Sequence, residues 1–176
     1  MNNKFSKPNK KYDQGFYIVK NKEKFIGDPS KVFYRSSWEK HFCAYCDFTD
    51  KIKKWGLENV TIPYQDAKGK IHRYIPDFYI EVAYPGQPDR YDRIVVEIKP
   101  KEEITPKFLD KSGRLIPANI YLEGKTFKAT QNYEYALKTY QKNLYKWTKA
   151  KVWCEKNGLQ FKLMGKEELQ KFKIMK

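Results

Sequence analysis

The most constraining feature of the sequence is the short segment RIVVEIKP at residues 93–100, an aliphatic run that ends in two charged residues. The run predicts a buried β-strand, in which successive side chains point to opposite faces of the sheet. Glu97 and Lys99 therefore share one face near the end of the strand. The other face carries only aliphatic side chains, those of Ile94, Val96 and Ile98. A core strand with two charges at one end requires a structural or a functional reason.

A second isolated carboxylate, Asp77, lies in the apolar segment YIPDFYI. The region 58–84 predicts two extended runs joined by a turn around residues 66–69, and residues 93–99 predict a third strand in an antiparallel meander. In adjacent antiparallel strands, Asp77 and Glu97 would face each other at about 5 Å. Two carboxylates so close repel each other, and a cation such as Mg²⁺ or Mn²⁺ is the group that neutralises them.

Helical periodicity lies on both sides of these strands. A first helix is expected to begin after Ser36 or Ser37, and Glu39 lies beside its apolar stripe of Trp38, Phe42 and Tyr45. Residues 131–158 predict a long helix that ends at Asn157-Gly158. Its apolar stripe consists of Tyr133, Leu137, Tyr140, Leu144 and Trp147.

The remaining segments complete the predicted architecture. Residues 159–164 predict a last strand, which joins the sheet in parallel because a crossover helix precedes it. Residues 166–173 predict a short closing helix. Residues 100–130 have no sustained period and predict an irregular excursion that faces the substrate. The expected fold class is therefore α/β, a single domain with a mixed β-sheet flanked by helices.

The charge of the chain points to a polyanionic partner. The 176 residues carry 36 Lys and Arg against 21 Asp and Glu, a formal net charge of +15, which suggests nucleic acid first and an anionic membrane surface second. No apolar run reaches the roughly 20 residues that span a bilayer, and no apolar signal core is visible at the N-terminus, so we expect a protein that stays inside the cell. Residues 1–24 predict a basic arm, which binds a partner or only improves solubility, before a domain at 25–176.

The three cysteines favour reduced thiols. Cys43 and Cys46 form a C-x-x-C motif, which is typical of a redox pair or of half a zinc site. The only histidines available to complete such a site are His41 and His72. The preferred interpretation is that both thiols are buried on one face of a helix.

The combination of Pro76-Asp77 with Glu97-Ile98-Lys99 resembles the signature of the PD-(D/E)XK nuclease superfamily. The resemblance extends to head completion nucleases of T-even-type tailed phages, which are similar to TnsA-type transposon endonucleases. The segments that carry it include YRSSWE (34–39), IPY (62–64), HRYIPDFYI (72–80), VEIKP (96–100) and NLYKW (143–147). Residues 101–131 align with nothing in this family. The resemblance implies a restriction-endonuclease-like fold and Mg²⁺-dependent hydrolysis of phosphodiester bonds.

By position, the resemblance implies a set of site residues. Asp77 and Glu97 would bind Mg²⁺, or Mn²⁺, together with the Ile98 carbonyl oxygen. Lys99 would activate the attacking water or stabilise developing charge. Glu39 would orient a metal-bound water or bind a second cation, although a glutamate near the start of a helix is also typical of a capping box. The residues expected to contact DNA are Arg35, His72, Arg73, Asn143 and Lys146.

The resemblance also implies a biological setting. The protein would act on packaged DNA ends during phage head completion, with portal, head or neck proteins as partners and no membrane. It would work in the host cytoplasm during assembly and then in the virion. Two alternatives remain open: a TnsA-type or restriction-type endonuclease, and a non-catalytic plug that binds DNA through charge alone.

Overall fold

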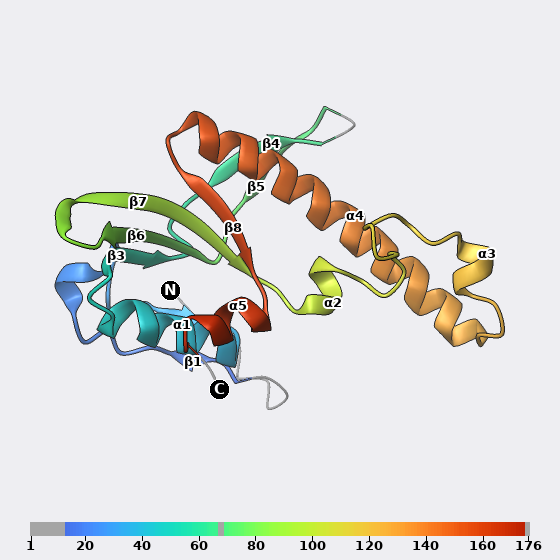
Figure 1. Cartoon of the computed structure of the whole chain (residues 1–176), viewed down its shortest axis with the longest axis horizontal. Helices are drawn as coiled ribbons and strands as arrows, with labels where there is room; N and C mark the ends of the chain where they lie inside the picture. The colour runs from blue at the N-terminus through green and yellow to red at the C-terminus, as the bar shows by residue number, and fades with distance from the viewer. Residues whose placement is uncertain (1–12, 67–68, 175–176) are drawn as a thin grey trace, which may run out of the picture.

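The computed structural model describes residues 13–66 and 69–174. Its centre is a four-stranded sheet in the order β3-β6-β7-β8 (Figure 1). The strands are β3 (Ile52–Leu57), β6 (Phe78–Tyr84), β7 (Gln87–Ile98) and β8 (Gln160–Met164). The first three run antiparallel, and β8 pairs in parallel with β7. The predicted mixed sheet is confirmed.

Helices cover both faces of this sheet. On one face, α1 (Ser37–Phe48) and α5 (Lys166–Lys171) pack on the side chains of Phe78, Ile94, Val96 and Ile98. On the other face, the long α4 (Phe127–Lys156) packs on Val95, Phe161 and Leu163. The alternation of β7 therefore divides two cores, as its sequence predicts. This layered arrangement is the restriction-endonuclease-like fold, and it confirms the predicted fold class.

The hairpin prediction needs two corrections. The strands β4 (Ile62–Gln65) and β5 (Ile71–Tyr74) pair only with each other, in a separate two-stranded sheet. The main sheet instead takes its edge strand β3 from residues that the sequence left unassigned. The extended segment is interrupted between β5 and β6, because Pro76 lacks the amide hydrogen that a continuous ladder of hydrogen bonds needs. Strand β7 also begins earlier than predicted, directly after a two-residue turn at Pro85-Gly86 in which Gly86 has a φ of 72°.

Part of the expected N-terminal arm packs on the domain. Residues 1–12 lie outside the described part of the chain. After them, β1 (Gly15–Phe16) pairs with β2 (Phe33–Tyr34), and the 3-10 helix η1 (Lys22–Lys24) lies between these strands in the chain. Val19 is buried in the core shared with α1. Residues 13–24 are therefore part of the folded body, and an arm over the residues before them stays a prediction.

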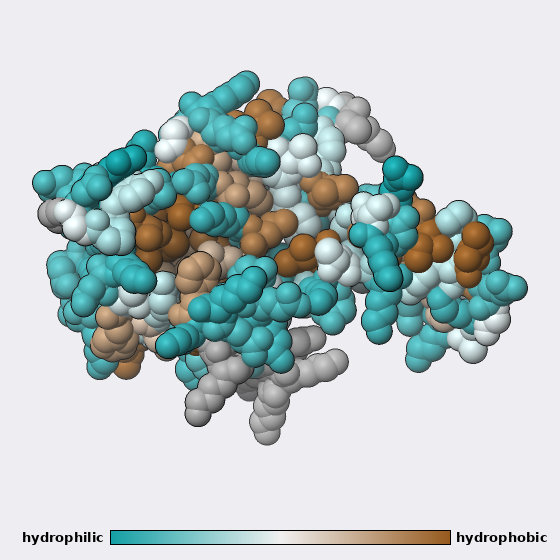
Figure 2. All heavy atoms as spheres, in the orientation of Figure 1, coloured by the Kyte–Doolittle hydropathy of each residue, from teal (hydrophilic) through white to brown (hydrophobic). Residues whose placement is uncertain are grey.

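The region between β7 and α4 forms a small lobe around one aromatic side chain. It contains α2 (Lys101–Ile104) and α3 (Ala118–Tyr121). Phe108 is buried, and its ring makes edge contacts with the rings of Tyr121, Tyr133 and Tyr140. The first half of α4 thus projects from the sheet with this lobe at its side (Figure 1). The lobe exposes apolar side chains among hydrophilic ones (Figure 2).

The three cysteines are free thiols buried in the core, as the preferred interpretation predicts. Cys43 and Cys46 lie on the buried face of α1, where burial raises the pKa of both thiols. Among the residues that the structure describes, no helix combines the length and the apolar composition that crossing a bilayer requires.

Candidate active site

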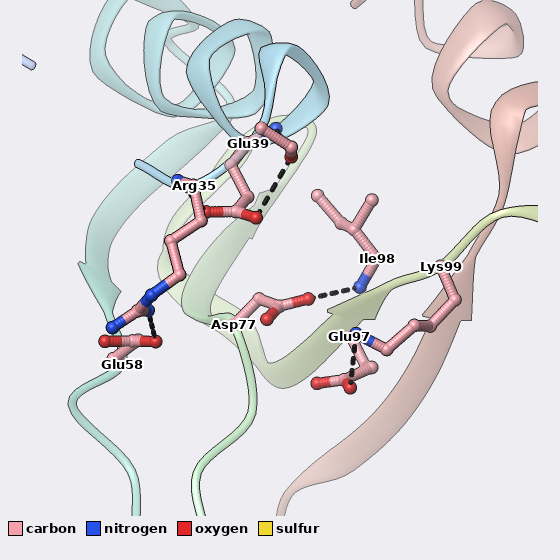
Figure 3. A network of polar contacts seen from close by, with 8 residues as sticks. Arg35, Glu39, Glu58, Asp77, Glu97, Ile98 and Lys99 are labelled. Carbon is pink, nitrogen blue, oxygen red and sulfur yellow. Dashed lines mark hydrogen bonds and ion pairs between the residues drawn. The ribbon is translucent and has the colours of Figure 1, made fainter. Parts of the chain in front are cut away.

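The structure brings Asp77 and Glu97 together at one end of the sheet. Phe78 at the start of β6 pairs with Val96 in β7, so the residues next to them, Asp77 and Glu97, are cross-strand neighbours. The backbone N–H of Ile98 donates a hydrogen bond to Asp77 Oδ2 at 2.7 Å (Figure 3). This bond fixes the first carboxylate beside the strand that carries the second.

Glu97 is the most unusual side chain of the site because it is charged and only 3% exposed. Its Oε1 lies 3.1 Å from Lys99 Nζ (Figure 3). Its Oε2 is buried and has no hydrogen-bond partner among the described residues. A buried carboxylate oxygen without a partner is costly, since desolvation is not repaid by any contact. The geometry therefore leaves one strong acceptor free beside Asp77.

Burial and charge act together on the ionisation of these groups. Burial first, and the charge of Glu97 second, raise the pKa of Asp77 to about 7. Lys99 and the Ile98 N–H oppose this rise, whereas the charge of Glu39 adds to it. For Lys99, burial lowers the pKa, but Asp77 and Glu97 outweigh it and the pKa is raised. The site is thus an acidic pair with one ammonium as its counter-charge.

Glu39 lies close to this pair but is held by the start of α1. The backbone N–H of Arg35 donates to Glu39 Oε2 at 2.7 Å, and the Ser36 hydroxyl donates to Oε1 at 3.0 Å (Figure 3). Ser36 Oγ in turn accepts from the Glu39 N–H at 3.2 Å, which is a capping arrangement. The carboxylate therefore caps the helix while its charge reaches Asp77. Arg35 itself forms an ion pair with Glu58.

The donor set fits a magnesium ion that keeps waters. No group of three His, Cys, Asp or Glu side chains placed to hold a metal occurs in the described parts of the chain. Mg²⁺ does not need one, since it is commonly held by one or two carboxylates, with waters and substrate phosphate completing its shell. Asp77 and the free oxygen of Glu97 supply two such carboxylates.

Three of the predicted DNA contacts line one cleft of about 600 Å³ between the β4–β5 hairpin and α4. These are His72, Arg73 and Lys146. Burial lowers the pKa of Lys146, and the charges of Glu97 and Asp77 oppose that change. The other two lie elsewhere: Asn143 is buried and donates to Glu103 Oε2 at 3.3 Å, and Arg35 is paired at the start of α1.

Comparison of the sequence with known proteins identifies the family of the chain. The sequence profile described as "TnsA-like endonuclease N terminal" matches residues 49–166, which is more than half of the chain. The chain belongs to the TnsA-like endonuclease family. It is also 33% identical over 157 residues to the "Head completion nuclease" of Enterobacteria phage T4, an alignment that covers 89% of this chain and 93% of that protein. No solved structure matches the chain. The predicted PD-(D/E)XK-type nuclease relationship is thus confirmed.

Two aromatic residues around Glu97 were missed by the sequence reasoning. Tyr74 Oη and Trp147 Nε1 are both buried without a hydrogen-bond partner in the described structure. The Tyr74 hydroxyl lies near the acidic pair, since burial and then the charges of Glu97 and Asp77 raise the pKa of Tyr74. Trp147 belongs to the same buried cluster as Tyr74. No sequence signal distinguishes Tyr74 and Trp147 from ordinary core aromatics. Trp147, for example, belongs to the apolar stripe of the long helix.

Proposed function

We propose that this protein is a Mg²⁺-dependent DNA nuclease that hydrolyses phosphodiester bonds with Asp77, Glu97 and Lys99. The observation that carries the proposal is the buried, unpartnered oxygen of Glu97 beside Asp77, in a chain of an endonuclease family. Mn²⁺ has the same preference for oxygen ligands and would substitute for Mg²⁺.

Each residue has a role that follows from its place. Asp77, the free oxygen of Glu97 and the Ile98 carbonyl would hold the metal. When bound, Mg²⁺ would supply positive charge to the scissile phosphate and to a water molecule. Lys99 would hold that water or stabilise the charge that develops on phosphorus, since its ammonium already lies 3.1 Å from Glu97. Glu39, held from the start of α1, would orient a metal-bound water.

The predicted DNA contacts divide by position. His72, Arg73 and Lys146 would hold phosphates along the cleft next to the acidic pair. Arg35 would contact the phosphate backbone of the DNA on the α1 side. Asn143 would act through Glu103, to which its amide is bound.

The similarity to a head completion nuclease supports a role in phage assembly. The protein would trim or cut packaged DNA ends before the tail joins, in the host cytoplasm and with portal, head or neck proteins as partners. The match over 49–166 to the TnsA-like profile favours a second candidate, strand cutting in transposition.

The decisive experiment is nicking of supercoiled plasmid at low salt with Mg²⁺, Mn²⁺ or EDTA. We expect the wild type to cut only with metal, and Asp77→Ala and Lys99→Met to lose at least about 100-fold in rate while they still bind DNA. Lys101→Met is the matched control, because Lys101 is exposed and pairs with Glu167 at 2.8 Å, so it should cut like the wild type. A wild type that binds but never cuts would favour the non-catalytic plug.

A further inference from the structure

The cleft between the hairpin and α4 is lined by aromatic rings and by cations, and both elements contribute both kinds of side chain. Tyr145, Tyr64 and His72 form a row of rings: Tyr64 stacks on His72 with 5.3 Å between centroids, and Tyr145 lies 6.3 Å from Tyr64. Arg73, Lys142 and Lys146 provide the positive side chains of the same cleft.

The ring row is held in place before any ligand binds. The Tyr145 hydroxyl donates to the Gln65 carbonyl at 2.7 Å, which ties α4 to the hairpin. On the other side, His72 Nε2 lies 2.7 Å from Asp66 Oδ2. A rigid aromatic surface loses little conformational freedom when a flat ligand stacks on it, so such a site favours binding.

The cleft leads directly to the proposed catalytic residues. Tyr74 lines it and is also the side chain whose hydroxyl is buried near Glu97. The ammonium of Lys146 lies 5.0 Å from the centre of the Tyr74 ring. A chain of phosphates lying in the cleft would therefore continue to the place where the metal is expected.

Size and chemistry together restrict the occupant. A volume of about 600 Å³ is typical of a site that encloses a ligand of nucleotide size rather than a duplex. Aromatic rings combined with cations are the pattern by which proteins bind single-stranded nucleic acid. The faces of a paired base are covered by its neighbours in the stack, so only an unpaired base is free to stack on a protein ring.

We propose that this cleft binds unpaired DNA: a base extends the row of Tyr145, Tyr64 and His72, and Arg73, Lys142 and Lys146 hold its phosphates. The inference rests on the proposed nuclease function and specifies its substrate. The enzyme prefers DNA with a single-stranded end or gap to a fully paired duplex, and it cuts next to the unpaired segment.

Binding in EDTA tests this preference without any need for cleavage. Fluorescence anisotropy would compare a labelled blunt duplex with the same duplex carrying an unpaired extension, using the full chain. We expect the extension to tighten binding by about 5- to 100-fold, which corresponds to the stacking of one base. Equal affinity for the two duplexes would overturn the proposal, and it would do so even if the protein proved to be an active nuclease.

Substitutions in the ring row identify the cleft as the source of the preference. Tyr64→Leu should abolish the gain from the extension, whereas Tyr64→Phe keeps the ring and should retain it. Tyr135→Leu is the control, because Tyr135 is 75% exposed in the first half of α4 and does not line the cleft. If Tyr64→Leu is poorly folded by thermal denaturation, Lys142→Gln replaces it. An unchanged gain from the extension in the variant that folds would exclude this cleft.

Discussion

Asp77 is a residue whose ionisation carries a cost in the metal-free protein. Burial, followed by the charge of Glu97, raises its pKa from 3.8 to about 7. Between about pH 4 and pH 7, the folded state therefore keeps a proton that the unfolded state releases. The stability that this residue contributes is complete at low pH, is lost as the pH rises through about 7, and does not return above it.

Asp77→Asn removes that ionisation and keeps an oxygen for the Ile98 N–H. In EDTA at about pH 8, we expect the variant to be more stable than the wild type by about 1–3 kcal/mol, and the difference should vanish near pH 4. Urea denaturation at the two pH values measures it. Asp50→Asn, at an exposed position after α1, should show no such pH-dependent gain. No stabilisation at high pH would mean that neither burial nor the charge of Glu97 disfavours the ionised form of Asp77.

At the scale of elements, a buried carboxylate attaches the N-terminal segment to α1. Asp47 is fully buried and accepts hydrogen bonds from the Tyr17 hydroxyl at 3.0 Å and from the N–H groups of Lys20 and Asn21 at 2.8 and 2.9 Å. Its own carbonyl accepts from the Asn21 side chain and from Lys24 Nζ. One side chain thus organises most of the connection between β1 and η1.

Asp47→Ala should therefore loosen this segment before it affects the sheet. Hydrogen bonds to a charged group are worth more than neutral ones, and the variant leaves buried donors unsatisfied, so we expect a loss of about 3 kcal/mol in the free energy of unfolding. Hydrogen exchange should rise first at the amides of Lys20 and Asn21. Asp50→Ala, which removes an exposed carboxylate, is the comparison. Unchanged exchange in 17–24 would show that the hydrophobic contacts of Val19 hold the segment without Asp47.

Periodicity in the sequence was sufficient to predict the helices and strands that bury one regular face. The alternation in 93–99 predicted both faces of β7, and the aromatic stripe predicted most of α4. Strand β3 was missed because KIKKWG alternates poorly and its core residues, Ile52 and Trp55, are three apart. The hairpin and its turn were predicted, but its separation from the main sheet was not, because nothing local distinguishes a strand that joins the main sheet from one that packs on a helix.

The same distinction applies to the candidate site: local sequence patterns predict some of its residues, whereas other contacts depend on tertiary packing. Asp77, Glu97 and Lys99 were predictable because charges stand out in apolar strands. The contact of Glu103 with Asn143, and its effect in raising the pKa of Lys99, depend on how the irregular segment after β7 folds back on α4. The ion pair of Arg35 with Glu58 likewise depends on the packing of β3 beside α1, which the sequence does not reveal.

At the scale of the whole molecule, the net charge of +15 could attract DNA as a whole or through a defined binding face. The cleft lies on the α4 side of the sheet, whereas α5 covers the opposite side. Attraction by total charge alone would make all lysines and arginines equivalent in DNA binding. A defined binding face makes them unequal. Only a lysine or arginine that neutralises a phosphate releases counterions from the DNA, so only those residues contribute to the salt dependence.

The salt dependence of DNA affinity distinguishes these two cases. Arg73→Gln removes one charge from the cleft, and we expect the slope of log Kd against log salt to fall by about 0.7–0.9 in magnitude, the value for one phosphate contact. Lys171→Gln removes the same charge from α5 and should leave the slope unchanged. Affinity would be measured in EDTA by anisotropy over a range of salt concentrations. Equal changes in the two variants would mean that DNA is held by the overall field, and the cleft would then have no special part in binding.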